Sequence, residues 1–323
     1  MRCVILLATA IGLWLGPERA PAQARAGGDA TREVAITFDD LPGVSMADQS
    51  MAHLERLTLA LLGSLARQRV PAIGFVNEEK LDSAGMTQPA RVALLEQWLA
   101  KGFDLGNHSF SHLDLHRVSI ADMEADAVKG DVTTRALLRA HGRVPKYFRH
   151  PFLHTGLDSA TRSNFESVLA NRGYRVAPVT IDNGDYVFAA AYGWSQAQGD
   201  TLSAKRVRAE YLGYMERVVS YYEQQSKAFL GREIRQVLLL HANALNADTF
   251  EELAELLRVR GYTFVTLDRA VADPAYSSPD QYYGPGGISW IHRWALTAGK
   301  RGAFFAGEPE VPDWITRLSR TTP

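Results

Sequence analysis

Residues 34–40, Val-Ala-Ile-Thr-Phe-Asp-Asp, join an apolar, β-branched run to two adjacent carboxylates. The run predicts a buried β-strand, and Leu-Pro-Gly at 41–43 predicts a turn directly after it. Two neighbouring ionised carboxylates repel each other and resist removal from water, so they indicate a cation beside them. The pair alone would be interpreted as a polar strand end. Together with the motifs farther along the chain, it predicts a metal ligand and a neighbouring base.

The composition excludes some functions and sets the size of the fold. The chain has 323 residues, with 35 Lys and Arg against 36 Asp and Glu. A nearly neutral chain has no basic surplus to attract nucleic acid or an anionic membrane. Hydrophobic residues make up 46% and charged residues 22%, which is typical of a globular protein, and the length favours one large α/β domain.

Residues 1–24 have the pattern of a secretory signal. Arg2 supplies a short positive start, residues 4–15 form an apolar core too short to span a bilayer, and the Ala-Gln-Ala at 22–24 offers a cleavage site. We therefore expect a secreted or periplasmic protein with no membrane span in its mature form.

An uncleaved anchor is the alternative interpretation of this segment. It is disfavoured because Gly12, Gly16 and Pro17 interrupt the apolar run. The only cysteine, Cys3, lies in the same segment, so the mature chain would use neither disulfides nor thiol chemistry.

Seven apolar stretches alternate with segments of helical pattern. The predicted strands are 34–40, 72–76, 103–107, 146–149, 175–181, 236–240 and 262–266. The predicted helices are 51–69, 87–102 with Thr87 as cap, 119–140, 158–169, 202–229 and 250–260. Strands that alternate with helices predict parallel βα units, and seven such strands would close or nearly close a barrel. The fold class is therefore α/β, with a seven-stranded (β/α) barrel.

Polar residues follow these strands directly. They are Asp39 and Asp40, His108, Arg149, Asp182 or Asp185, and His241. In a barrel of this kind, functional groups gather at the carboxyl ends of the strands. We therefore expect these groups to meet at one rim.

A metal site is expected among them. His108 and His112 would lie on one helical turn, close enough to share a cation. Asp40 completes two nitrogens and one carboxylate, a set expected of catalytic zinc and compatible with other divalent ions. We therefore predict that Asp40, His108 and His112 bind a divalent metal, with Zn²⁺ expected. His116 continues the spacing and is the alternative third ligand.

Hydrolysis is the natural use of such a metal. It polarises a carbonyl oxygen and lowers the pKa of its water from about 15.7 toward about 7. Asp39 would accept a proton from that water, and Arg149 would hold its charge and orientation. His241 would donate a proton to a leaving amine, and Asp185 would keep it cationic. In isolation, His241 would be interpreted as a buried neutral histidine bonded to backbone.

Five short motifs occur in a fixed order. They are Thr-Phe-Asp-Asp at 37–40, His-Ser-Phe-Ser-His at 108–112, Arg-His-Pro-Phe at 149–152, Asp-Asn-Gly-Asp-Tyr at 182–186 and Leu-Leu-His at 239–241. In this order they resemble the motifs of the polysaccharide deacetylase family, the carbohydrate esterases with a NodB-like domain. The similarity spans about residues 33–268. It implies a distorted (β/α) barrel, a divalent metal, commonly zinc, and removal of acetyl groups from N-acetylated or O-acetylated sugars.

The resemblance implies the same roles as the chemistry of the residues: Asp39 is the base, His241 is the acid, and Asp40, His108 and His112 are the metal ligands. It adds the backbone N–H of Phe152 as an oxyanion donor, typically worth about 3–4 kcal/mol. Leu239 and Tyr186 would shape a pocket for the acetyl methyl. Three residues depart from the family pattern: Leu41 replaces glycine, His150 replaces proline and Tyr186 replaces tryptophan. Each borders the substrate, so the departures concern specificity.

We predict three segments: a signal at 1–24, a deacetylase domain at 33–272, and an aromatic-rich C-terminal extension at 273–323. The extension is expected to pack on the barrel, because large aromatic side chains are usually buried; a glycan-binding role is the alternative. Tyr192 and Trp194, in an expected loop, are better candidates to touch substrate.

The sequence therefore predicts an exported, metal-dependent hydrolase that removes acetyl groups from the amides of N-acetylated glycans, such as peptidoglycan or chitin-like material. An O-acetyl esterase acting on a polysaccharide such as xylan is one alternative. A carbohydrate-binding protein without turnover is another, disfavoured because every expected catalytic position is filled.

Overall fold

Seven parallel strands form the main sheet of the structure, a computed structural model that describes residues 32–45, 48–83 and 85–320. They are β1 Arg32–Leu41, β2 Ala72–Val76, β5 Asp104–Asn107, β6 Tyr147–Phe148, β7 Arg175–Val176, β8 Gln236–His241 and β9 Tyr262–Phe264. A short antiparallel pair, β3 Asp82–Ser83 and β4 Met86–Thr87, lies outside this sheet. All seven predicted strands are therefore present, while the predicted signal at 1–24 lies outside the described residues.

The sheet runs in the order β7-β6-β5-β2-β1-β8 and curls until its ends meet. Past β7 the chain continues to Ile181, which bridges to Leu238 of β8. The backbone N–H groups of Thr180 and Ile181 both donate to the Val237 carbonyl at 3.0 Å. The sheet is thus a distorted (β/α) barrel, as predicted, although residues 177–181 close it without forming a regular strand.

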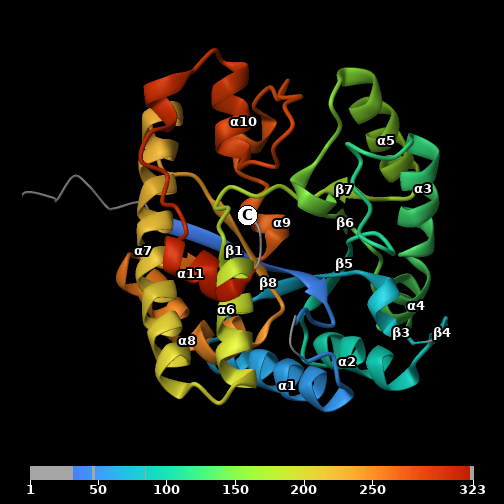
Figure 1. Cartoon of the computed structure of the whole chain (residues 1–323). Helices are drawn as coiled ribbons and strands as arrows, with labels where there is room; N and C mark the ends of the chain where they lie inside the picture. Colours follow the sequence, from blue (N-terminus) through green and yellow to red (C-terminus); the bar gives the residue numbers. More distant parts are fainter. Residues whose placement is uncertain (1–31, 46–47, 84, 321–323) are drawn as a thin grey trace, which may run out of the picture. The chain divides into compact units, whose positions relative to one another are not determined.

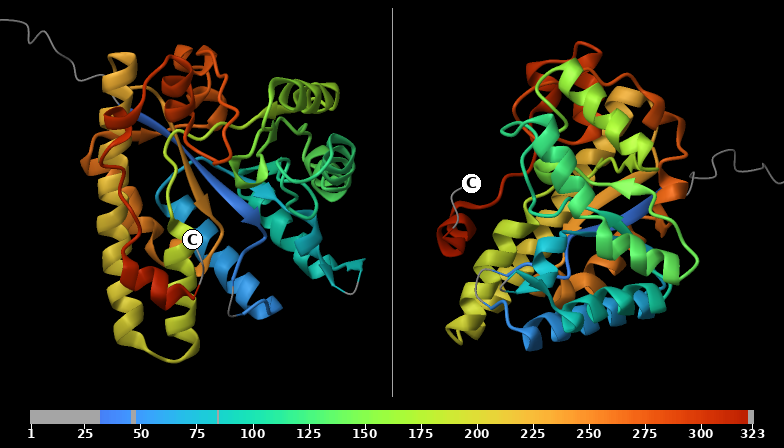
Figure 2. Two further views of the ribbon diagram at one scale, coloured as in Figure 1. Left: turned by 45° about the horizontal axis from the view of Figure 1, so that its top comes forward. Right: turned by 90° about the vertical axis from the view of Figure 1, so that its right-hand side faces the viewer.

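β1 is the central strand, and Figure 2 shows it in blue with β8 in orange beside it. It pairs with β2 and β8, while β9 pairs with its first residues. Its apolar residues from Val34 to Phe38 are at most 1% exposed. A strand covered on both faces needs a continuous apolar sequence, which explains why residues 34–38 do not alternate with polar ones.

Helices cover the sheet (Figure 1). They are α1 Met51–Arg67, α2 Pro89–Ala100, α3 Ile120–Lys129, α4 Val132–Ala140, α5 Ser159–Asn171, α6 Asp185–Ala197, α7 Thr201–Leu230, α8 Ala244–Val259, α9 Leu267–Ala270, α10 Trp290–Thr297 and α11 Asp313–Ser319. Short 3-10 turns are η1 Glu78–Leu81, η2 Pro151–Leu153, η3 Pro274–Ser277 and η4 Gly302–Phe305. Within the described residues, none of the helices has the length and apolar character needed to cross a membrane.

Two helix predictions are wrong at their boundaries. The predicted helix over 119–140 is divided into α3 and α4 at Gly130, which packs on a neighbouring loop. A Cβ at Gly130 would lie 2.3 Å from the carbonyl carbon of Ser109, so only glycine permits this approach. Thr87 does not cap α2, because it lies in β4 and its hydroxyl donates to Asp82 Oδ1 at 2.8 Å. Helix α2 begins at Pro89, a residue suited to a first turn.

The expected loop with Tyr192 and Trp194 is part of helix α6. Tyr192 is buried, and its hydroxyl donates to Asp248 Oδ2 at 2.7 Å. Arg320 lies over the ring of Trp194, 4.7 Å from its centre. Neither side chain lines the cavity at the carboxyl ends of the strands, which is described below, so their positions do not support the prediction that they touch substrate.

The C-terminal extension lies against the barrel over its described residues. Trp290 and Trp294 are buried, and the backbone N–H of Trp290 donates to the Val179 carbonyl at 2.7 Å. Helix α10 contacts α7, and α11 contacts α6. The boundary between domain and extension near residue 272 stays a prediction.

Phe38 offers a test of the core behind β1. Its ring packs on Trp98 at 6.0 Å and on Phe250 at 5.8 Å between ring centres. Phe38→Ala should lower the free energy of unfolding by about 3–5 kcal/mol, because it removes apolar contacts and leaves a cavity. Leu59→Ala, at a position 58% exposed, should change it by no more than about 0.5 kcal/mol. Urea unfolding measures both, and equal losses would contradict the packing described.

Candidate active site

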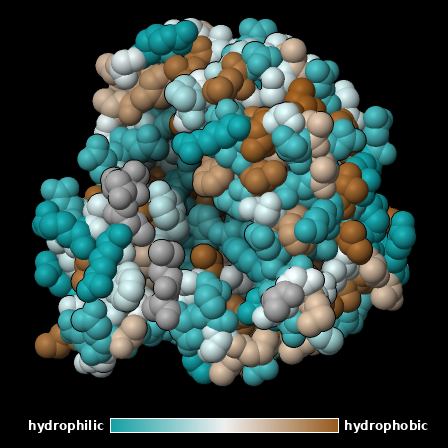
Figure 3. Space-filling view, turned by 45° about the vertical axis from the view of Figure 1, so that its right-hand side comes forward, coloured by the Kyte–Doolittle hydropathy of each residue, from teal (hydrophilic) through white to brown (hydrophobic). Residues whose placement is uncertain are grey.

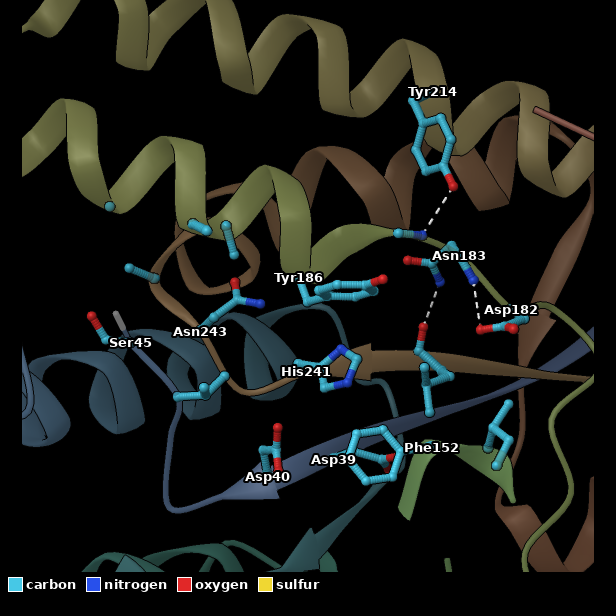
Figure 4. Close-up of a pocket in the computed structure, with 18 of the residues that line it drawn as sticks. Asp39, Asp40, Ser45, Phe152, Asp182, Asn183, Tyr186, Tyr214, His241 and Asn243 are labelled. Carbon is cyan, nitrogen blue, oxygen red and sulfur yellow. Dashed lines mark hydrogen bonds between the residues drawn. The ribbon is translucent and has the colours of Figure 1, made fainter. Parts of the chain in front are cut away.

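A cavity of about 980 Å³ lies at the carboxyl ends of the strands. It is lined by the ends of β1 and β8, by the loop after β5, by η2 and α6, and by residues of the C-terminal extension. The face of the molecule in Figure 3 is hollowed, with hydrophilic residues along much of the hollow. Figure 4 shows Asp39, Asp40 and His241 together in the cavity, with Tyr186 beside His241.

The loop at residues 108–112 follows β5 and carries two of the predicted ligands. It is not helical, so the prediction that His108 and His112 share a helical turn is wrong. Ser109 and His112 have φ of 65° and 60°. A residue of a neighbouring helix holds the loop in this conformation. Asp126 of α3 accepts the Ser111 N–H at 3.1 Å and the Ser111 hydroxyl at 2.6 Å. The turn still brings the two imidazole rings to 4.8 Å between centres.

Asp40, His108 and His112 each offer a ligand atom, and these atoms lie within 4.8 Å of one another. The φ of Asp40 is 72°, so the backbone at the end of β1 is turned into the left-handed region. One carboxylate and two imidazoles suit zinc and related divalent ions, with space left for water and substrate. The donor set therefore fits a divalent metal.

The protonation state of His108 is also the one that a metal ligand requires. Its Nδ1 donates to the Arg149 carbonyl oxygen at 2.8 Å, because a carbonyl only accepts. Burial lowers the pKa of His108 well below its ordinary value, so the ring is neutral and Nε2 presents a lone pair. A backbone carbonyl on the far nitrogen is the usual support of a metal-binding histidine.

His116, the alternative third ligand, lies in a different group. Its ligand atom is within 4.8 Å of those of Asp114 and His154. The rings of His116 and His154 are stacked, 3.9 Å between centres and 6° between planes. Imidazole lone pairs lie in the ring plane, so two stacked rings cannot both direct one at the same ion. This group is therefore not a metal site in the geometry observed.

Asp39 is buried beside Arg149. Its Oδ2 lies 3.6 Å from Arg149 Nη1 and 3.8 Å from His108 Nε2. Burial raises the pKa of Asp39 to about 6, against the opposing effect of Arg149. Its Oδ1 has no hydrogen-bond partner among the described residues. A carboxylate with this pKa and a free oxygen can accept a proton near neutral pH.

Arg149 is itself held in place by the barrel. Its side chain is fully buried, and its Nη2 donates to the Thr37 hydroxyl at 3.1 Å. Its guanidinium also lies over the ring of Phe75, 4.7 Å from the centre. The cation beside Asp39 is therefore fixed by β1 and β2.

His241, at the end of β8, is paired with a buried carboxylate. Its Nδ1 donates to Asp185 Oδ1 at 2.7 Å, and Asp185 Oδ2 accepts the backbone N–H of His241 at 2.8 Å. Burial lowers the pKa of His241, but the negative charge and the hydrogen bond of Asp185 have the larger effect. The pKa of His241 is therefore raised to about 9. His241 is therefore protonated at neutral pH and can act as a proton donor.

The remaining predicted residues border the same cavity. Phe152 packs its ring edge-on against His112 at 4.5 Å between centres, and Tyr186 packs similarly near His241 at 5.9 Å. Leu239 is nearly buried, and its carbonyl accepts the Asn183 side-chain N–H at 2.7 Å (Figure 4). The structure thus gathers every residue predicted for the site around this cavity, while the role of each residue stays a prediction.

The two acids of the fourth motif lie in different places. Asp185 contacts His241, whereas Asp182 lines another part of the cavity, where burial raises its pKa to about 7. Two further polar residues escaped the sequence analysis. Lys80 Nζ lies 2.8 Å from Asp40 Oδ1, and Asn246 Nδ2 donates to Asp185 Oδ2 at 2.6 Å. Lys80 follows β2 closely, so the rule that polar groups cluster after strands would have indicated it.

Residues 26–177 match the model of the family described as polysaccharide deacetylase. A chitin deacetylase of Colletotrichum lindemuthianum is 23% identical over 77% of this chain and 82% of its own. A chitin deacetylase of a Pestalotiopsis species is 23% identical over 82% of this chain and 71% of its own.

The fold agrees with these matches. The solved structure of the Colletotrichum lindemuthianum chitin deacetylase superimposes with a TM-score of 0.50 and 21% identity, covering 75% of this chain and 89% of that one. The family model, the curated relatives and the distorted barrel lead to the same assignment. They support the polysaccharide deacetylase family for this chain.

Proposed function

We propose that this protein is an exported, metal-dependent deacetylase that hydrolyses the acetyl amides of an N-acetylated glycan, such as chitin-like material or peptidoglycan. One observation carries the proposal: the ligand atoms of Asp40, His108 and His112 converge within 4.8 Å, directly beside a buried base and a protonated histidine. Two of the curated relatives are chitin deacetylases, which supports an N-acetylated glycan as the substrate class. Export rests on the signal pattern of residues 1–24.

Asp40, His108 and His112 would hold the metal, for which we propose Zn²⁺. When bound, it would supply Lewis-acid polarisation of the acetyl carbonyl and of the attacking water. Asp39 Oδ1 would accept the proton of that water, while Arg149 keeps Asp39 oriented and ionised.

The remaining steps belong to two other groups. The backbone N–H of Phe152 would donate to the oxygen that gains negative charge as the carbonyl carbon becomes tetrahedral. His241, protonated through Asp185, would give its Nε2 proton to the leaving nitrogen, which departs as a free amine. Tyr186 and Leu239 would enclose the acetyl methyl, since both line the cavity.

Acetate release tests the function directly. We expect the purified protein, loaded with zinc, to release acetate from N-acetylated chito-oligosaccharides or peptidoglycan and to lose this activity when a chelator is added. Acetylated xylan is the control substrate and should be hydrolysed more slowly. Faster release from xylan would favour the O-acetyl esterase, and binding of glycan without release from any substrate would favour a carbohydrate-binding protein.

Two substitutions separate the proposed base from the proposed ligands. Asp39→Asn should retain the metal and lower kcat by about 10²–10⁴-fold, because it removes only the proton acceptor. His112→Ala should lose the metal, because it removes a ligand. His141→Ala, at a histidine paired with Glu96 and absent from the cavity lining, is the matched control and should change neither quantity. Metal content per chain and kcat are measured, and equal metal loss in Asp39→Asn and His112→Ala would refute the division of roles.

The pH dependence tests the proposed acid. His241 acts in its protonated form, so activity should fall as the pH rises through its pKa of about 9. Asp185→Asn removes the carboxylate that raises this pKa, so the alkaline limb of kcat/KM should move to lower pH by roughly 1–2 units. Asp248→Asn, which alters the partner of Tyr192, is the control. An alkaline limb at the same pH in both variants and the wild type would rule out His241 as the acid.

A further inference from the structure

The backbone of Phe152 packs directly against a glycine of the C-terminal extension. A Cβ at Gly287 would lie 1.7 Å from the Phe152 carbonyl oxygen and 3.1 Å from the Leu153 Cβ. No side chain fits in such a space, so the contact requires glycine. The extension therefore reaches the residue proposed to donate to the oxyanion.

The turn that Gly287 contacts is strained. Phe152 and Leu153 both have a φ of 57°, a region that costs free energy for residues other than glycine. Such a conformation persists only where the surrounding structure holds it. Among the described residues, no backbone acceptor takes the Phe152 N–H, so that donor is available to a ligand.

Gly287 is fixed by the residues that follow it. The Ser289 hydroxyl donates to the Thr180 carbonyl at 2.8 Å, and the backbone N–H of Trp290 donates to the Val179 carbonyl at 2.7 Å. Both carbonyls belong to residues 177–181, which close the barrel. The glycine is thus anchored to the sheet that carries the catalytic groups.

A second residue of the extension holds the other end of the same turn. Arg293 of α10 is buried, and its Nη2 donates to the Thr155 hydroxyl at 2.6 Å. Its Nη1 also approaches the Leu153 carbonyl, at 3.5 Å, and its Nε donates to Asp280 Oδ2 at 2.8 Å. The extension therefore contacts the turn at residues 152, 153 and 155.

We propose that Gly287 is a positioning residue for deacetylation, which holds the backbone of Phe152 so that its N–H points at the reacting oxygen. This inference rests on the proposed function and extends it to the C-terminal extension. The extension is then part of the active site, and not only a cover for the barrel.

The proposal predicts a large effect from one methyl group. Gly287→Ala must push the Phe152 carbonyl away by roughly 1 Å or more, and a displacement of that size costs on the order of 10²-fold in rate. Loss of one oxyanion donor costs a similar factor. We expect kcat to fall about 10²-fold, with KM changed less than about threefold, because the N–H acts on the transition state and not on substrate binding.

The neighbouring glycine is the matched control. A Cβ at Gly286 would lie 3.6 Å from the Tyr282 hydroxyl and 3.7 Å from Ile288 Cγ2, which are ordinary contacts. Gly286→Ala should therefore keep kcat within about twofold of the wild type. Metal content and the pH profile should be the same in both variants, since neither touches the proposed ligands, base or acid.

The experiment measures kcat, KM and metal content for both variants, together with the amide resonance of Phe152 in protein labelled with ¹⁵N-phenylalanine. Phe152→Leu identifies that resonance. We expect it to shift in Gly287→Ala and to stay in place in Gly286→Ala. A Gly287→Ala variant with the kcat and Phe152 resonance of Gly286→Ala would overturn the inference, as would a rise in KM with kcat unchanged.

Two outcomes need a second readout. If Gly287→Ala does not fold, Thr155→Val removes the contact with Arg293 instead; a fall in kcat of about tenfold with constant KM supports the inference, and an unchanged kcat refutes it. If the wild type releases no acetate, the proposed function fails on its own. The Phe152 resonance then still decides whether Gly287 fixes the turn.

Discussion

Two adjacent carboxylates, Asp39 and Asp40, are removed from water at the end of the central strand. Burying two neighbouring negative charges costs free energy, and the site depends on the cations that offset this cost. Each has its own cation: Arg149 lies 3.6 Å from Asp39, and Lys80 lies 2.8 Å from Asp40. Burial prevails at Asp39 and raises its pKa to about 6. At Asp40 burial is outweighed by Lys80, His241 and neighbouring imidazoles, which hold its pKa below the ordinary range. Neighbours in sequence thereby become suited to different tasks, a proton acceptor and a metal ligand.

The parallel barrel makes this arrangement possible. Several strands end in polar groups at the same rim, and residues as distant in sequence as Asp39 and His241 are register partners on β1 and β8. The groups are then oriented by second partners: the Arg149 carbonyl fixes the His108 ring, and Asp185 fixes the His241 ring. Such partners hold a site rigid before substrate arrives, which is where much of the catalytic advantage of an enzyme lies.

The local sequence pattern was sufficient to predict the strands and the residues that end them. A strand buried on both faces has a continuous apolar sequence, and a polar residue follows directly where the strand ends. The local pattern was insufficient wherever contacts with residues distant in the sequence determine the conformation. The turn at 108–112 takes its shape from Asp126 and Gly130, and 185–197 is helical because its apolar residues are covered by α7 and α11. The contact of Gly287 with Phe152 has no sequence signature at all, since it depends on how the extension returns to the barrel.

The central claim is that Asp40, His108 and His112 enclose one divalent ion. X-ray absorption spectroscopy at the zinc edge of the zinc-loaded protein tests it most directly. We expect two imidazole nitrogens and a carboxylate oxygen at ~2.0–2.2 Å from the metal, with the remaining positions filled by oxygen. A spectrum without imidazole scattering, or with oxygen from water alone, would contradict it.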